Sequence, residues 1–171
     1  RHVFLGDKKQ TPEQALLADY AQRIAIARAA TATGNYQEFT KLGNLLRLAP
    51  APLRNGPEAL KWLRKAADKG YAAAQLGLGE MYEQGQGVKQ DYHRAAEWYV
   101  LATRLSKDSV AYFRLGELYL KGHGVAQDYS KALTNYQIAA AAGHPVAHYI
   151  LGTMAESGWG NPHWPSRWYG R

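Results

Sequence analysis

The sequence predicts an all-α protein in which antiparallel helix pairs stack on one another. A fourteen-residue string carries most of this prediction, because it begins at Gly79 and again at Gly116, with nine of its 14 positions identical. A weaker third copy begins at Gly152. Between the copies, small and bulky apolar residues recur three and four positions apart, which is the spacing of one helix face. Repeats of this period are typical of stacked units that shelter each other's apolar faces.

The composition is that of a folded chain with one domain. Its 171 residues are 46% hydrophobic and 20% charged, and no apolar run approaches the roughly 18 residues that span a bilayer. The absence of cysteine excludes disulfides, thiolate nucleophiles and cysteine-ligated zinc. No signal peptide is recognisable, and because the chain starts at Arg1 rather than Met, its first residues do not indicate a compartment.

Residues 11–50 predict a pair of helices. Thr11 is followed by proline and stands three residues before Gln14, as in a capping box, so a helix of about 20 residues is expected to start here. Gly34-Asn35 ends that helix, and a second one is expected from Tyr36 to about Leu48. The short join makes the two helices antiparallel neighbours.

Two types of helix alternate from residue 57 onward, each with one apolar face. Alanine on these faces lets helix axes approach closely, while the larger residues fill the space between them. The first type carries Ala59, Trp62, Leu63 and Ala66, then Ala95, Trp98, Tyr99 and Ala102, then Ala132, Asn135, Tyr136 and Ala139. The second type carries Ala74, Leu78 and Tyr82, then Ala111, Leu115 and Tyr119, then Ala147, Leu151 and Ala155.

A glycine-rich link joins each second-type helix to the next helix. Gly85 and Gly122 stand where a helix ends in a left-handed residue, a conformation that glycine adopts without a side-chain clash. Asp91 and Asp128 are placed to cap the helix that follows. A phosphate-binding glycine loop is excluded, because the links lack both a preceding strand and a Gly-Lys-Ser/Thr ending.

The repeated string reads Leu-Gly-Glu-x-Tyr-x-x-Gly-x-Gly-Val-x-Gln-Asp-Tyr, and its first copy is followed by Ala-x-x-Trp-Tyr at residues 95–99. These motifs resemble the Sel-one-like repeat, a branch of the tetratricopeptide-like α/α repeats, and the resemblance covers residues 57–160. It implies a right-handed α/α solenoid with a concave inner surface. It also implies a non-catalytic scaffold or adaptor for other proteins, in bacterial envelope, signalling or secretion systems. The disulfides of cysteine-rich relatives do not carry over to this cysteine-free chain.

We therefore expect a single repeat domain over residues 1–171. Residues 1–10 are a lead-in, residues 11–50 a degenerate helix pair, residues 57–160 the repeats and residues 161–171 an aromatic C-terminal cap. The cap contains Trp164 and Trp168, and Trp159 lies just before it. The three tryptophans have two interpretations: a lid over the last repeat, which a repeat stack needs, or an anchor for a partner.

The concave surface is the expected binding site. It would be lined by the helices at about residues 71–84, 109–121 and 145–157, through the stripe opposite each core face. That stripe consists of Leu76, Glu80 and Glu83, then Phe113, Glu117 and Leu120, then Tyr149, Thr153 and Glu156. An anionic, partly apolar groove of this kind suits a basic or amphipathic peptide better than nucleic acid. The alternative interpretation is a solvated helix face without a partner.

The net charge of +7 motivates a second function. Cations outnumber acids between residues 41 and 65, where only Glu58 opposes Lys41, Arg47, Arg54, Lys61, Arg64 and Lys65. Binding of nucleic acid or another polyanion through a basic outer surface is therefore the alternative to the protein scaffold, and a solvated surface is the interpretation without a partner.

The sequence predicts neither catalysis nor a cofactor. His144 and His148 lie four residues apart on an expected helix, but no third metal ligand accompanies them, so no metal site is predicted. No nucleophile elbow or paired-carboxylate motif is present. We expect a bacterial protein of the periplasm or cytoplasm, with the periplasm favoured, and the oligomeric state is left open.

Overall fold

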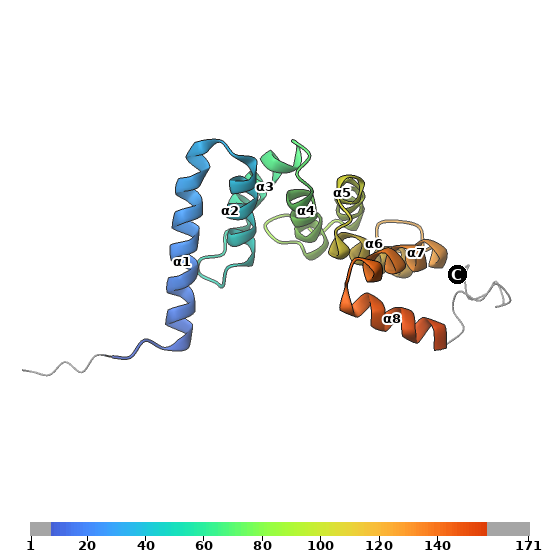
Figure 1. Cartoon of the computed structure of the whole chain (residues 1–171). Coiled ribbons are helices and arrows are strands. Elements are labelled where there is room, and N and C mark those ends of the chain that lie inside the picture. The colour runs from blue at the N-terminus through green and yellow to red at the C-terminus, as the bar shows by residue number, and fades with distance from the viewer. Residues whose placement is uncertain (1–7, 157–171) are drawn as a thin grey trace, which may run out of the picture.

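The structure is a computed structural model that describes residues 8–156. Within this range the chain forms helices and no strand, so the all-α prediction is confirmed. Figure 1 shows the helices following one another along an arch. They are α1 (Pro12–Ala30), the 3₁₀ turn η1 (Thr31–Thr33), α2 (Tyr36–Leu48), α3 (Gly56–Ala67), α4 (Ala72–Gln84), α5 (Tyr92–Leu105), α6 (Ser109–Lys121), α7 (Tyr129–Ala141) and α8 (Pro145–Glu156).

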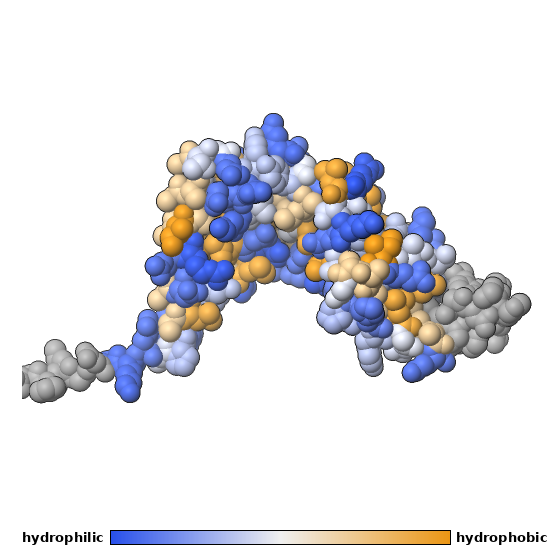
Figure 2. Space-filling model, in the orientation of Figure 1, coloured by the Kyte–Doolittle hydropathy of each residue, from blue (hydrophilic) through white to orange (hydrophobic). Residues whose placement is uncertain are grey.

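Each α-helix packs against the helices that precede and follow it in the sequence, which is the arrangement of a solenoid. We call α1, α3, α5 and α7 the first helices and α2, α4, α6 and α8 the second helices. The second helix α2 also contacts the second helix α4 directly, whereas a groove lies between the first helix α5 and the link that leads into α7. We therefore assign the second helices to the inner row of the arch, whose hollow underside Figure 2 shows.

The helix starts follow the expected capping. The Thr11 hydroxyl accepts a hydrogen bond from the Gln14 backbone N–H at 3.1 Å, and the Gln14 side chain accepts one from the Thr11 N–H at 3.0 Å. This reciprocal pair confirms the capping box. The second helix of the N-terminal pair runs from Tyr36 to Leu48, as predicted, and Gly34 ends the preceding turn with a φ of 73°.

The two glycine links have the predicted left-handed glycines and helix caps. Gly85 and Gly122 end α4 and α6 with φ angles of 67° and 68°. The carboxylates of Asp91 and Asp128 then cap α5 and α7, each accepting a backbone N–H three residues later at 3.0 Å. The matching geometry in the two links explains why both keep the same residues.

A glutamine that both copies share has a role that sequence reasoning missed. The side-chain amide of Gln90 donates to the carbonyl of Glu83 at 2.8 Å, and that of Gln127 donates to the carbonyl of Leu120 at 2.9 Å. Each glutamine thus satisfies a carbonyl in the last turn of the helix before the link. This bond fixes the path of the link between one second helix and the next first helix.

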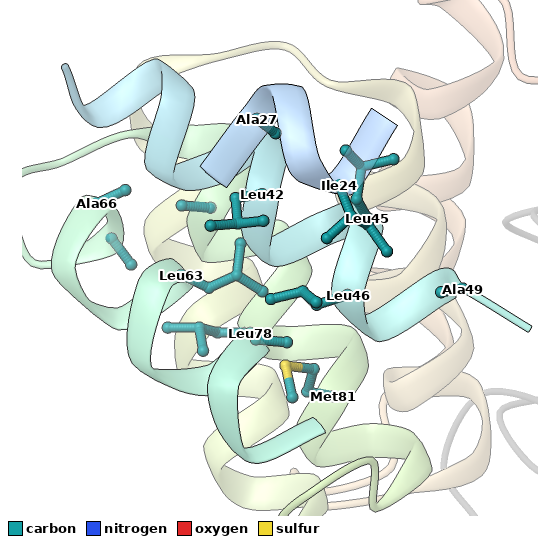
Figure 3. Close-up of a cluster of buried hydrophobic side chains, with 13 residues drawn as sticks. Ile24, Ala27, Leu42, Leu45, Leu46, Ala49, Leu63, Ala66, Leu78 and Met81 are labelled. Carbon is teal, nitrogen blue, oxygen red and sulfur yellow. The ribbon is translucent and has the colours of Figure 1, made fainter. Parts of the chain in front are cut away.

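The core consists of three clusters of buried residues along the stack, which the half-buried rings of Trp98 and Tyr119 join. At the N-terminal end, Ile24 and Ala27 of α1 meet Leu42 of α2 and Leu63 of α3 (Figure 3). In the repeats, one glycine of α4 and one of α6 each receive an aromatic ring from the following first helix. A Cβ added to Gly79 would lie 2.4 Å from a ring carbon of Tyr99, and one added to Gly116 would lie 2.8 Å from Tyr136. The glycine of the Leu-Gly-Glu string is therefore required by close helix packing.

The N-terminal half of α1 is largely exposed. Ile24 and Ala27 are buried, but Leu16 is 49% exposed. The reason is length, since α1 has 19 residues and its neighbour α2 has 13. The first turns of α1 therefore extend past the helix against which they would pack (Figure 1).

Candidate functional site: the inner face of the second helices

The predicted stripe residues lie on the second helices, but with different exposure. Half-buried positions on α4 and α6 are Leu76, Glu80, Glu83, Glu117 and Leu120. Exposed positions on α8 are Tyr149, Thr153 and Glu156. Trp159, Trp164 and Trp168 lie outside the described residues. We call the surface formed by these positions on α4, α6 and α8, together with the adjoining side of α2, the inner face.

A largely buried arginine neutralises the first of the three glutamates. The Arg47 side chain is only 7% exposed, and its Nη1 lies 3.4 Å from Oε2 of Glu80. Its Nε donates to the Asn44 side chain at 2.8 Å, which holds the guanidinium in place. Arg47 therefore belongs to the inner face and not to a basic outer surface, which corrects the grouping made from the cation run.

The second glutamate is held by a tyrosine from the neighbouring first helix. The hydroxyl of Tyr99 donates a hydrogen bond of 2.5 Å to Oε2 of Glu83. Burial, together with this bond to a carboxylate, raises the pKa of Tyr99 far above its ordinary value, so the phenol stays protonated and remains a donor. The bond ties α4 to α5 and fixes the position of Glu83.

The third glutamate shares an arginine with the other two. Arg114 Nη1 lies 3.4 Å from Oε2 of Glu117. Burial lowers the pKa of Arg114, but the charges of Glu80, Glu83 and Glu117 outweigh burial and raise it above its ordinary value. Two arginines thus share three carboxylates, so this part of the inner face has far less net negative charge than the acidic stripe predicted.

Phe113 differs most from the expected open stripe. It is only 7% exposed and stacks on His144, with ring centroids 4.2 Å apart and an interplanar angle of 15°. Burial lowers the pKa of His144, which favours its neutral form, and its Nδ1 accepts the backbone N–H of Ala147 at 3.2 Å. The histidine therefore packs and caps the first turn of α8, and His148 is exposed. No group of metal-ligating side chains occurs within residues 8–156.

The C-terminal part of the inner face is open. Tyr149 of α8 is 76% exposed, and Val146 one turn earlier is 47% exposed. Glu156 is exposed and forms no ion pair with any residue that the structure describes. Among the described residues, this region therefore presents exposed apolar side chains and a carboxylate without an ion-pair partner, in contrast to the paired charges on α4 and α6.

The two arginines and the tyrosine hydroxyl are site features that sequence reasoning missed. Arg47 lies 33 residues before Glu80, and Tyr99 lies 16 residues after Glu83. No local pattern links these two pairs. Arg114 did have a local signal, because it lies three residues before Glu117 on the same helix.

Comparisons with known proteins agree with this architecture. The Sel1 repeat family matches residues 42–71, 72–107 and 109–144. A crystal structure of a Sel1 repeat protein from Oxalobacter formigenes is 34% identical, covers 76% of this chain and 97% of its own, and superimposes with a TM-score of 0.64. The Helicobacter pylori cysteine-rich protein B shares the fold at 24% identity, with 82% and 97% of the two chains covered and a TM-score of 0.59.

A curated relative matches over a shorter length. Chitin synthase regulatory factor 3 of Schizosaccharomyces pombe is 51% identical over 51 residues, which are 30% of this chain and 6% of that protein. The chain therefore spans only a small part of this relative. No helix among residues 8–156 is long and apolar enough to cross a membrane. From its three matched repeats and their stacked helix pairs, we conclude that the chain belongs to the Sel1 repeat family.

Proposed function

We propose that this protein is an adaptor that binds a segment of a partner protein on its inner face, centred on α6 and α8. Sel1 repeat proteins are generally scaffolds for protein interactions and are typically non-catalytic. The observation that carries the proposal is the open end of the inner face, where Tyr149 is 76% exposed. A large aromatic ring of this kind is a frequent anchor at protein interfaces.

The charges of the inner face indicate the chemistry of the partner segment. Glu80 and Glu117 already have arginine partners, so they contribute little free negative charge. Glu156 lacks such a partner within the described chain, and Leu120 adds half-buried apolar surface on α6. A segment with one or two basic residues beside an apolar side chain would complement this surface.

Capture from a lysate of the native organism tests the proposal. The tagged full chain would be compared with Tyr149→Ala and with Glu156→Lys, because both side chains are exposed and their replacement leaves the core intact. We expect each substitution to reduce capture of the same partner at least fivefold. Gln137→Lys is the matched control, since this exposed residue lies on the first helix α7.

Reversal of Glu80 or Glu117 is a poorer test, because it would break ion pairs that hold the second helices together. Equal capture by wild type, Tyr149→Ala and Glu156→Lys would contradict the inner-face proposal. If only Gln137→Lys reduced capture, the partner would bind the first helices and not the inner face. Circular dichroism of each variant separates loss of binding from loss of fold.

Polyanion binding is the second candidate. It is favoured by Lys61, Arg64 and Lys65, which are all exposed on α3. Against it, Trp62 and Trp98 are half-buried against the core, whereas single-stranded nucleic acid is bound by rings that are free to stack on bases. Affinity for an oligonucleotide that falls steeply with salt would support this candidate.

The proposal includes a bacterial setting in an envelope, signalling or secretion system, with the periplasm favoured over the cytoplasm. The bacterial Sel1 repeat structure that covers 76% of this chain supports the bacterial part. Fractionation of cells that express the full-length natural protein would test the compartment.

A further inference from the structure

The solvent-facing positions of the first helices change their chemistry from one repeat to the next. On α3 the exposed stripe is Lys61, Arg64, Lys65 and Asp68. Thirty-six residues later, the equivalent positions on α5 are Glu97, Val100, Leu101 and Arg104. Two adjacent cations of α3 are thus replaced by two aliphatic residues on α5. We call the surface formed by these stripes the outer face, since it lies on the side opposite the second helices.

The aliphatic residues of α5 line a groove. It has a volume of about 690 Å³ and lies between α5 and the link at residues 124–128 that leads into α7. Its apolar lining comes from Ala96, Val100, Leu101, Tyr119 and Val125, and Glu97, Arg104, Asp128 and Lys131 add charges of both signs. A volume of this size is enough to accommodate a few apolar side chains of a bound segment.

The cations of α3 are held in position by aromatic rings. The Nζ atoms of Lys61 and Lys65 lie 5.3 and 5.0 Å from the ring centroid of Trp62. The guanidinium of Arg64 lies 5.4 Å from the ring of Trp98. Cations placed over ring faces lose less conformational freedom when they bind an anion than free side chains would.

Lys61 and Lys65 form no ion pair with any residue between 8 and 156, whereas Arg64 pairs with Asp68 at 3.0 Å. The carboxylate of Glu58 lies close enough to act on Lys61, but it is bound by Arg28, and this bond and, to a smaller extent, the charge of Lys61 lower the pKa of Glu58. The α3 stripe therefore keeps cationic charge available for a further carboxylate. This distinguishes it from the inner face, where arginines and glutamates already satisfy each other.

The basic stripe and the apolar groove form one continuous surface. Arg64 of α3 reaches over Trp98 of α5, so no gap separates the two helices at this level. α5 carries both Trp98, which Arg64 covers, and Val100 and Leu101, which line the groove, so the stripe and the groove meet on α5.

We propose that the outer face docks an acidic amphipathic segment of a partner protein. Its carboxylates bind Lys61 and Lys65 on α3, and its apolar side chains enter the groove between α5 and the link that leads into α7. Charge complementarity and the apolar lining point to a protein segment, because a nucleic acid would place phosphates, not apolar groups, along the groove. This site is separate from the inner face and does not depend on it.

A labelled peptide tests the proposal. The probe is a fluorescein-labelled twelve-residue peptide with four glutamates in its first half and three leucines in its second half, measured by fluorescence anisotropy with the full chain. We expect saturable binding that weakens at least tenfold for Lys61→Glu combined with Lys65→Glu, and at least fivefold for Leu101→Asp. A peptide with lysines in place of the glutamates should bind at least tenfold more weakly.

Matched controls come from α2. Lys41→Glu reverses an exposed lysine, and Leu48→Asp replaces a leucine that is 55% exposed. Both should leave the affinity within twofold of wild type, as should Tyr149→Ala on the inner face. Circular dichroism checks that every variant keeps its helices.

Several results would overturn the proposal. One is the absence of saturable binding, and another is an equal loss with the α2 controls. A third is an oligonucleotide that binds through Lys61 and Lys65 but is insensitive to Leu101→Asp, which would identify a polyanion site. A fourth is a dimer of wild type that Leu101→Asp dissociates in sedimentation, which would make a second copy of the chain the occupant.

Discussion

The inner and outer faces of this solenoid use their charges in opposite ways. On the inner face, the Arg47 side chain is 7% exposed and contacts Glu80, and Arg114 lies among three carboxylates. On the outer face, Lys61 and Lys65 are exposed over a tryptophan ring. Charges that fasten one helix to the next are part of the fold, whereas charges without an internal partner remain available to a ligand. A count of acidic residues along a stripe does not distinguish these two cases.

The two faces should differ most in the stability that is lost when one cation is removed from each. Arg47→Met removes the ion-pair partner of the mostly buried Glu80, which then keeps only the charge of the shared Arg114, and should lower the free energy of unfolding by up to about 3 kcal/mol. Lys61→Met removes an exposed cation and should change it by less than about 0.5 kcal/mol. Urea denaturation followed by circular dichroism measures both. If the two variants lost a similar free energy of unfolding, the charges of the inner face would be no more important for the fold than those of the outer face.

A second contrast concerns the glycines of the second helices. Gly79→Ala would place a methyl group 2.4 Å from the Tyr99 ring and should destabilise the protein by about 2 kcal/mol through overpacking. Gly152 has no described neighbour within 4 Å of the same position. Gly152→Ala should therefore stabilise α8 by up to about 1 kcal/mol through helix propensity. Thermal melts of both variants measure these opposite changes in stability. Equal destabilisation by the two substitutions would argue against close packing at Gly79.

A smaller effect is expected from the hydroxyl that links α5 to the inner face. Tyr99→Phe keeps the ring beside Gly79 but removes the hydrogen bond to Glu83. We expect a loss of about 1.5 kcal/mol, as for a hydrogen bond to a charged group. Tyr136→Phe is the matched control, since that ring occupies the equivalent place against Gly116. A loss as large as that of Tyr99→Phe in the control would show that the bond to Glu83 adds nothing.

The smallest effect should be the pH dependence at the start of α8. Burial lowers the pKa of His144 in the folded state, so the unfolded chain binds the proton more tightly. Stability is therefore full above the ordinary histidine pKa and is lost as the pH falls through the folded value. His144→Gln should flatten the dependence between pH 7 and pH 5, measured by denaturation at each pH. An unchanged slope would mean that His144 titrates equally in both states.

The repeat string made most of the fold predictable. Gly85, Asp91 and their equivalents 37 residues later act through neighbours within a few positions, so their roles followed from local chemistry. The predicted second helix at Tyr36–Leu48 has the same bounds in the structure. The exposed N-terminal half of α1 was not predictable in this way, because periodicity does not reveal where a packing neighbour ends.

The candidate site was predicted only in outline. Helical spacing placed Glu80, Glu83 and Glu117 on the second helices correctly. It also grouped Phe113 with them, although that ring is buried between Tyr136 and His144. Whether a residue at a given helical angle reaches solvent depends on the helix packed beside it, and that helix lies about 20 to 30 residues away in the sequence.

The sequence by itself determined the repeat, the helix ends and the core faces, because all three depend on residues close to one another along the chain. Only the tertiary structure decided which charges are already paired and which remain free. That distinction rests on distances between helices, such as the 3.4 Å from Arg47 of α2 to Glu80 of α4. Electrostatic interactions fall off over a few ångströms when charges face water, so small differences in helix placement separate a structural ion pair from a binding site.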